Sequence, residues 1–200
     1  MDLDVVDRLH GDVPHLEVLR SALGAEPALP AVVLLPTPYG QVKVDVLEVP
    51  QIELDEPSDD AGDRLHASSH AWANDTATEM TLGVSQSNGE SIEATTLVAE
   101  PGPLVAMKLQ AVMNRSTAKQ GTDFLDITRI MLDRATRPAA IEQIGNVEVS
   151  VASDIALHVD LWLVSRQAQA LRLINAVGGA DITSDDIALV SEFLIDACER

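Results

Sequence analysis

Three basic side chains follow one another at helical spacing in the segment from Leu104 to Lys119. Lys108, Arg115 and Lys119 are separated by seven and four residues. In a continuous helix, at about 100° per residue, they fall within one angular sector. Aligned cations repel one another unless an anion or carboxylates lie nearby. The pattern indicates an anion-binding groove, and the alternative is a solvated face paired with the acidic residues of positions 123–126.

Carboxylates recur in the first part of the chain. Asp2 and Asp4 are two residues apart at a predicted strand over residues 3–6, so their side chains point to the same side. Asp45 lies in a second predicted strand, over residues 42–49. If these two strands are neighbours, the three carboxylates converge. Such a cluster suits Mg²⁺ ions that are held by oxygen ligands and bridge to the phosphates of a nucleotide.

The surrounding elements that must position these residues form an α+β fold. Alternating and continuous apolar runs predict strands in the first half of the chain, and Pro101-Gly102-Pro103 marks a change to helical patterns. We therefore expect a mixed-sheet lobe over residues 1–101 and a helical lobe over residues 102–200. The predicted strands cover 3–6, 31–35, 42–49, 80–84 and 92–98, with a hairpin over 31–49 and a turn at Asn88-Gly89. The predicted helices cover 15–23, 64–78, 104–119, 123–134 with Thr122 as N-cap, 138–145, 153–177 and 184–198.

Composition narrows the class of protein. The chain has 46% hydrophobic and 22% charged residues and a formal net charge of −19, which suits a soluble protein whose field repels nucleic acid and anionic membranes at long range. It contains one cysteine, Cys198, as expected in a reducing compartment. No apolar run approaches the roughly 20 residues of a membrane span, and the acidic start is unlike a signal peptide. We expect a cytoplasmic protein.

The basic segment and the carboxylates also resemble a known family in their order along the chain. The string Leu104–Ala111, followed by Arg115, Lys119, Asp123 and Asp126, is similar to the helix pair of the AbiEii-like nucleotidyltransferase toxins, which belong to the polymerase-β-type superfamily and to type IV toxin–antitoxin systems. That family also carries an Asp-x-Asp strand, matched by Asp2 and Asp4, and a third carboxylate, matched by Val44-Asp45-Val46-Leu47. One departure is that Gly121-Thr122 separates Lys119 from Asp123.

The resemblance implies a nucleotidyltransferase-like first lobe and an Mg²⁺-dependent enzyme. Such an enzyme transfers a nucleotide from an NTP to the 3′ end of tRNA or to a protein hydroxyl. It implies metal ligands at Asp2, Asp4 and Asp45, with catalytic roles for Asp45, Lys108 and Asp123. It further implies substrate-binding roles for Arg115, Lys119 and Asp126. A cognate antitoxin is the implied protein partner, and the long apolar C-terminal helices leave a homodimer open.

The beginning of the chain departs from the family pattern. In the family, a helix, a strand and a Gly-Gly or Gly-Ser turn precede the Asp-x-Asp pair, and the turn binds phosphates through backbone N–H groups. This sequence begins at the pair and lacks the expected helix and strand. Two readings follow. Either the true start lies upstream, or the chain is a truncated, non-catalytic relative that acts as a binding or partner protein.

Overall fold

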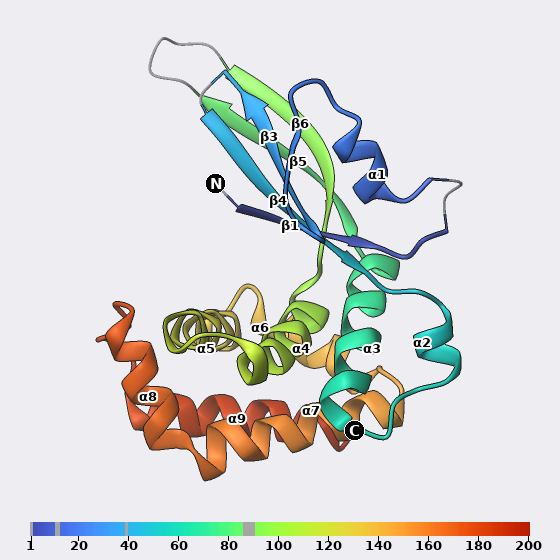
Figure 1. Cartoon of the computed structure of the whole chain (residues 1–200). Helices are drawn as coiled ribbons and strands as arrows, with labels where there is room; N and C mark the ends of the chain where they lie inside the picture. The colour runs from blue at the N-terminus through green and yellow to red at the C-terminus, as the bar shows by residue number, and fades with distance from the viewer. Residues whose placement is uncertain (1, 11–12, 39, 86–90) are drawn as a thin grey trace. The chain divides into compact units, whose positions relative to one another are not determined.

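The computed structural model describes residues 2–10, 13–38, 40–85 and 91–200, without the side chains of Asp2 and Val84. The chain forms two compact units, Met1–Asp59 and Asp60–Arg200, which are described separately (Figure 1). The predicted α+β class is confirmed, with a mixed sheet first and helices after it. The boundary expected between residues 101 and 102 lies inside the second unit, because a strand hairpin there leads directly into the helices.

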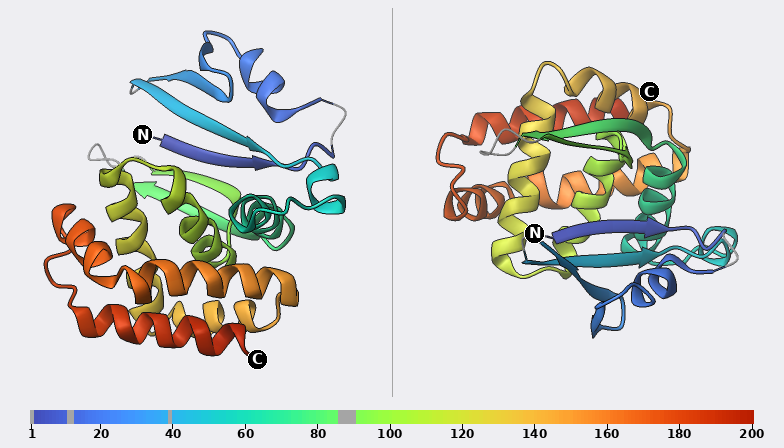
Figure 2. Two further views of the ribbon diagram at one scale, coloured as in Figure 1. Left: turned by 60° about the horizontal axis from the view of Figure 1, so that its bottom comes forward. Right: turned by 90° about the horizontal axis from the view of Figure 1, so that it is seen from above.

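Unit 1 is built on a four-stranded sheet with the order β1-β4-β3-β2. Strand β1 runs parallel to β4, and the other neighbours are antiparallel (Figure 2). The predicted hairpin of β3 and β4 is confirmed. Strand β2 was not expected, because its sequence contains Pro27 and lacks alternation, as edge strands can. The elements are β1 (Asp2–Asp7), α1 (His15–Arg20), β2 (Glu26–Leu29), β3 (Val32–Thr37), β4 (Gly40–Glu48) and α2 (Ile52–Asp55).

One face of this sheet is apolar and is covered by α1. Val44 and Val46 of β4 pack with Val33 of β3 and with Leu16 of α1, and all four side chains are buried. Successive strand residues point to opposite faces. The residues between the valines, including Lys43 and Asp45, therefore lie on the face away from α1.

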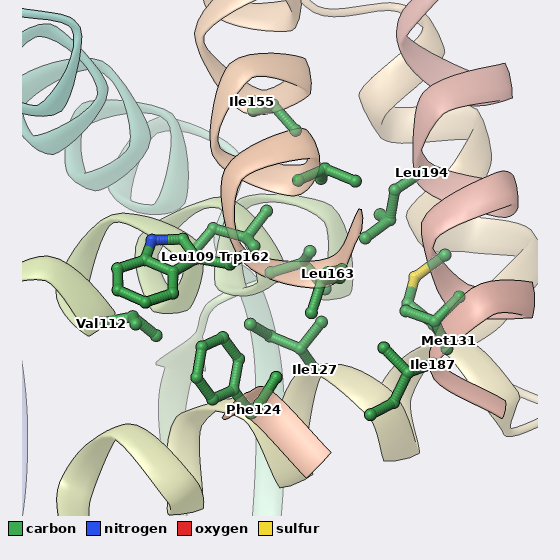
Figure 3. Close-up of a cluster of buried hydrophobic side chains, with 14 of the residues drawn as sticks. Leu109, Val112, Phe124, Ile127, Met131, Ile155, Trp162, Leu163, Ile187 and Leu194 are labelled. Carbon is green, nitrogen blue, oxygen red and sulfur yellow. The ribbon is translucent and has the colours of Figure 1, made fainter. Parts of the chain in front are cut away.

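Unit 2 combines a two-stranded ribbon with a helical core. The ribbon pairs β5 and β6 in antiparallel register, and the predicted turn at Asn88-Gly89 lies outside the described residues. The core is built mainly from aliphatic side chains around Phe124 and Trp162 (Figure 3). The elements are α3 (Ala61–Asp75), β5 (Thr78–Ser85), β6 (Ser91–Val98), α4 (Pro101–Ala111), the 3₁₀ helix η1 (Val112–Asn114), α5 (Thr117–Leu132), α6 (Arg137–Gly145), α7 (Val149–Val159), the π-helix η2 (Asp160–Ser165), α8 (Gln167–Ala176) and α9 (Ser184–Cys198).

The prediction of one helix over residues 104–119 is wrong. Helix α4 ends at Ala111, the η1 turn follows, and Arg115 and Ser116 are extended before α5 begins. The amide of Gln120 donates to the Val112 carbonyl at 2.8 Å, which satisfies a carbonyl group that the break leaves without a helical partner. Ser116, not Thr122, is the N-cap of α5. The three cations therefore do not share one helix face.

Gly121 lies inside α5 because this helix packs closely on α8. A Cβ atom at Gly121 would lie 2.4 Å from the Leu173 carbonyl oxygen, a separation that requires the two backbones to move apart. We expect Gly121→Ala to lower the free energy of unfolding by about 3 kcal/mol, measured by urea denaturation. Gly83→Ala is the control, because a Cβ there meets nothing within 4 Å. Equal effects of the two substitutions would contradict this explanation.

The predicted helix over residues 153–177 is also interrupted. Helix α7 passes into the π-helix η2, and Arg166 leaves the helical conformation with φ −114° and ψ 24° before α8 begins. The Arg166 guanidinium lies 4.8 Å from the centroid of the Trp162 ring, a cation–π contact that a regular hydrophobic period does not reveal. Among the described residues, no helix combines the length and the apolar character needed to cross a bilayer.

Candidate functional site

Two of the three predicted metal ligands lie on neighbouring strands of unit 1. Asp4 of β1 is the register partner of Asp45 of β4, and the strands are parallel. Adjacent strands are about 4.8 Å apart, so these carboxylates share the face of the sheet away from α1. Asp2 pairs through its backbone with Lys43, and its side chain lies outside the described atoms. The convergence expected for Asp4 and Asp45 is therefore supported by the register of the strands.

Lys43 is the residue of this face that the sequence prediction missed. Its Nζ atom lies 2.5 Å from Oδ2 of Asp45, and the two side chains are 31% and 24% exposed. The signal was available in the sequence, because residues two apart on a strand share a face.

The donor set on this face fits Mg²⁺ in its chemistry. Magnesium binds oxygen ligands, commonly one or two carboxylates together with phosphates of the substrate, and Asp4 and Asp45 offer two carboxylates from adjacent strands. Among residues whose side chains the structure describes, no group of three His, Cys, Asp or Glu is arranged to hold a metal ion. A magnesium ion bound to Asp4 and Asp45 would therefore take its remaining ligands from the phosphate oxygens of the substrate or from Asp2.

Four of the other predicted site residues form one ion-pair network in unit 2. Lys108 of α4 places Nζ 2.7 Å from Asp126 and 3.3 Å from Asp123 of α5. The Arg115 guanidinium lies 3.2 Å from both carboxylate oxygens of Asp123. Lys119 is exposed and makes no ion pair with any residue in the described ranges. The structure thus brings together Lys108, Arg115, Asp123 and Asp126 and leaves Lys119 apart.

This network is formally neutral and partly buried. Its centre is the side chain of Asp123, which is 2% exposed, whereas that of Asp126 is 37% exposed. Burial of a carboxylate is costly unless charged partners lie beside it, and Lys108 and Arg115 are those partners of Asp123. The sequence offered, as an alternative, a solvated basic face paired with the acidic residues 123–126. This pairing is present for Lys108 and Arg115, but its central carboxylate is more buried than expected.

Two histidines lie beside α4 in unit 2. The rings of His66 and His70 on α3 are 4.4 Å apart at their centroids, and Nδ1 of His66 is 3.4 Å from the Gln110 amide oxygen. The pKa of His70 is lowered to about 4, mainly by burial; a hydrogen bond with the His66 carbonyl raises this pKa, and the nearby charges of His66 and Arg115 lower it. His70 is therefore neutral in the folded protein near pH 7.

The lowered pKa of His70 predicts a loss of stability in acid. Below its ordinary pKa of 6.5, the unfolded chain takes up a proton that the folded chain accepts only near pH 4, so stability falls as the pH falls from about 6.5 to 4. Between pH 7 and pH 5 we expect this histidine to contribute a loss of about 2 kcal/mol. Urea denaturation of the wild type and of His70→Gln at both pH values measures it. An identical pH dependence in the two proteins would contradict the assignment.

No family model, curated protein or solved structure matches this chain. Its fold and site define it as an α+β protein with a pair of carboxylates on the face of a mixed sheet away from α1, and with a second, helical unit that contains a neutral ion-pair network.

Proposed function

We propose that this protein is an Mg²⁺-dependent nucleotidyltransferase that transfers a nucleotide from an NTP to a hydroxyl acceptor, at the 3′ end of tRNA or on a protein. One observation carries the proposal: Asp4 and Asp45, 41 positions apart in the sequence, are register partners on adjacent parallel strands. Two carboxylates placed side by side repel one another. A divalent cation bound by both of them would offset this repulsion and give the pair a function.

In this proposal the work of unit 1 is to hold the metal and the reacting groups. Asp4 and Asp45 bind the cation, with Asp2 as a third ligand. Bound Mg²⁺ supplies positive charge to the phosphate oxygens of the nucleotide. Asp45 also accepts the proton of the acceptor hydroxyl, the general-base role open to a carboxylate within hydrogen-bonding reach. The hydroxyl oxygen forms a bond to the α-phosphorus of the NTP, and the bond between the α- and β-phosphates breaks with release of pyrophosphate. The roles predicted for Lys108, Arg115, Lys119, Asp123 and Asp126 on the triphosphate and the acceptor stay predictions.

The biological setting of this proposal follows from the resemblance to the AbiEii-like nucleotidyltransferase toxins. As a toxin of this type, the protein would act in the cytoplasm on cellular NTP and tRNA and would be opposed by a cognate antitoxin. A homodimer through the C-terminal helices is compatible with this setting.

Titration of the whole chain with Mg²⁺ and each NTP, followed by assays of transfer from a labelled NTP to a tRNA pool, tests the proposal. We expect NTP binding that depends on Mg²⁺, and transfer that Asp45→Ala and Lys108→Ala both reduce. If both variants transfer nucleotides as well as the wild type, the proposal is wrong.

A second candidate is a non-catalytic relative that retains the fold as a binding or partner protein. It is favoured by the ion-pair network, because Lys108 and Arg115 are neutralised by carboxylates of their own unit. The two-helix motif then has a structural explanation that needs no nucleotide. This candidate expects no Mg²⁺-dependent binding of any NTP in the same titration.

A further inference from the structure

The carboxylate face of unit 1 already contains a cation from the protein itself. The ammonium of Lys43 lies 2.5 Å from Oδ2 of Asp45. Both residues belong to β4, two positions apart, and therefore point to the same face of the sheet. The neighbouring strand β1 places Asp4 beside Asp45 and Asp2 beside Lys43.

The charges along this face explain why the ammonium is held there. Asp4 and Asp45 are neighbours of like charge on strands about 4.8 Å apart, and their repulsion is relieved by a positive charge close by. Lys43 supplies that charge by binding one oxygen of Asp45. The same oxygen is one of those that a divalent cation would use.

We propose that the Lys43 ammonium is an internal counter-ion that competes with the divalent cation for Asp45 and must leave this carboxylate before the metal binds. The inference rests on the proposed function in that the competing cation is the Mg²⁺ of nucleotidyl transfer. Because binding of the metal includes the release of Lys43, the apparent affinity is lower than the affinity of the carboxylates alone. Lys43 thereby sets the metal concentration at which the site fills.

The test compares Mn²⁺ binding, followed by electron paramagnetic resonance and calorimetry, in the wild type and in variants of the whole chain. Lys43→Met removes the ammonium, and we expect it to bind Mn²⁺ about five- to tenfold more tightly than the wild type. Lys43→Arg keeps the positive charge, and we expect no gain in affinity. Arg134→Met is the matched control, because it changes the net charge equally at an exposed position of unit 2 that has no role in the proposed site.

Thermal unfolding in EDTA shows whether each variant is folded. If Lys43→Met is unfolded, Lys43→Gln replaces it, since the amide can still donate to Asp45 without carrying a charge. Equal or weaker Mn²⁺ binding by the folded uncharged variant overturns the inference and leaves the proposed function standing. A similar gain in Arg134→Met overturns it as well, because the effect would then be one of net charge. Absence of Mn²⁺ binding in every protein overturns both the inference and the proposed function.

Discussion

Asp45→Asn is expected to weaken Mg²⁺-dependent NTP binding by more than about 100-fold. Even the outer partners of a metal site contribute about 10- to 100-fold to affinity, and Asp45 is proposed as a direct ligand with Asp4 as its register neighbour. Asparagine preserves the shape of the side chain and removes its charge. Calorimetric titration of the variant with NTP, in the presence and in the absence of Mg²⁺, measures the loss.

Two controls separate loss of the site from loss of the fold. Glu17→Gln removes an exposed carboxylate from α1, on the other face of the sheet, and should bind as the wild type does. The melting temperature of Asp45→Asn without Mg²⁺ should change little, because the variant loses both the pair with Lys43 and the repulsion from Asp4. Mg²⁺-dependent binding that survives in a folded Asp45→Asn protein would remove Asp45 from the site.

The sequence predicts more of the sheet face with Lys43 and Asp45 than of the helices in unit 2. Alternation along residues 42–49 correctly separates the buried valines from the face with Lys43 and Asp45. Which strand lies beside β4, and in which register, depends on pairing over about forty residues, which no local pattern encodes. The sequence therefore predicts the adjacency of Asp4 and Asp45 only on the condition that their strands are neighbours, and the strand register fulfils this condition.

The errors in the helices have tertiary causes. The segment before Arg115 contains no Pro or Gly that would indicate a break, so propensity alone continues the helix. The break depends instead on Gln120 reaching back to the Val112 carbonyl. Gly121, which the sequence leaves between two predicted helices, is needed where α5 meets the Leu173 backbone of α8, 52 positions away. One contact spans eight positions and the other 52, and helix propensity displays neither.

Asp123→Ala is expected to lower the free energy of unfolding by about 3 kcal/mol. Its side chain is 2% exposed and accepts hydrogen bonds from both Lys108 and Arg115, so the substitution removes the centre of the network and leaves two cations with fewer partners. Asp126→Ala is the matched variant. Because Asp126 is 37% exposed and, within the described ranges, pairs only with Lys108, the Asp126→Ala substitution should cost about 1 kcal/mol or less. Urea denaturation at neutral pH measures both.

The difference between these two carboxylates also bears on what the helix pair is for. If the network serves mainly to hold α4 against α5, Asp123→Ala and Asp123→Asn should both destabilise the protein. Adding Lys108→Met to either variant should then recover part of the lost stability, because it removes a cation left without its buried partner. If the network instead serves a nucleotide, Asp123→Asn should fold with near wild-type stability and bind NTP less well. Equal destabilisation by Asp123→Ala and Asp126→Ala would contradict the structural role, because burial would then have no influence on what each carboxylate contributes.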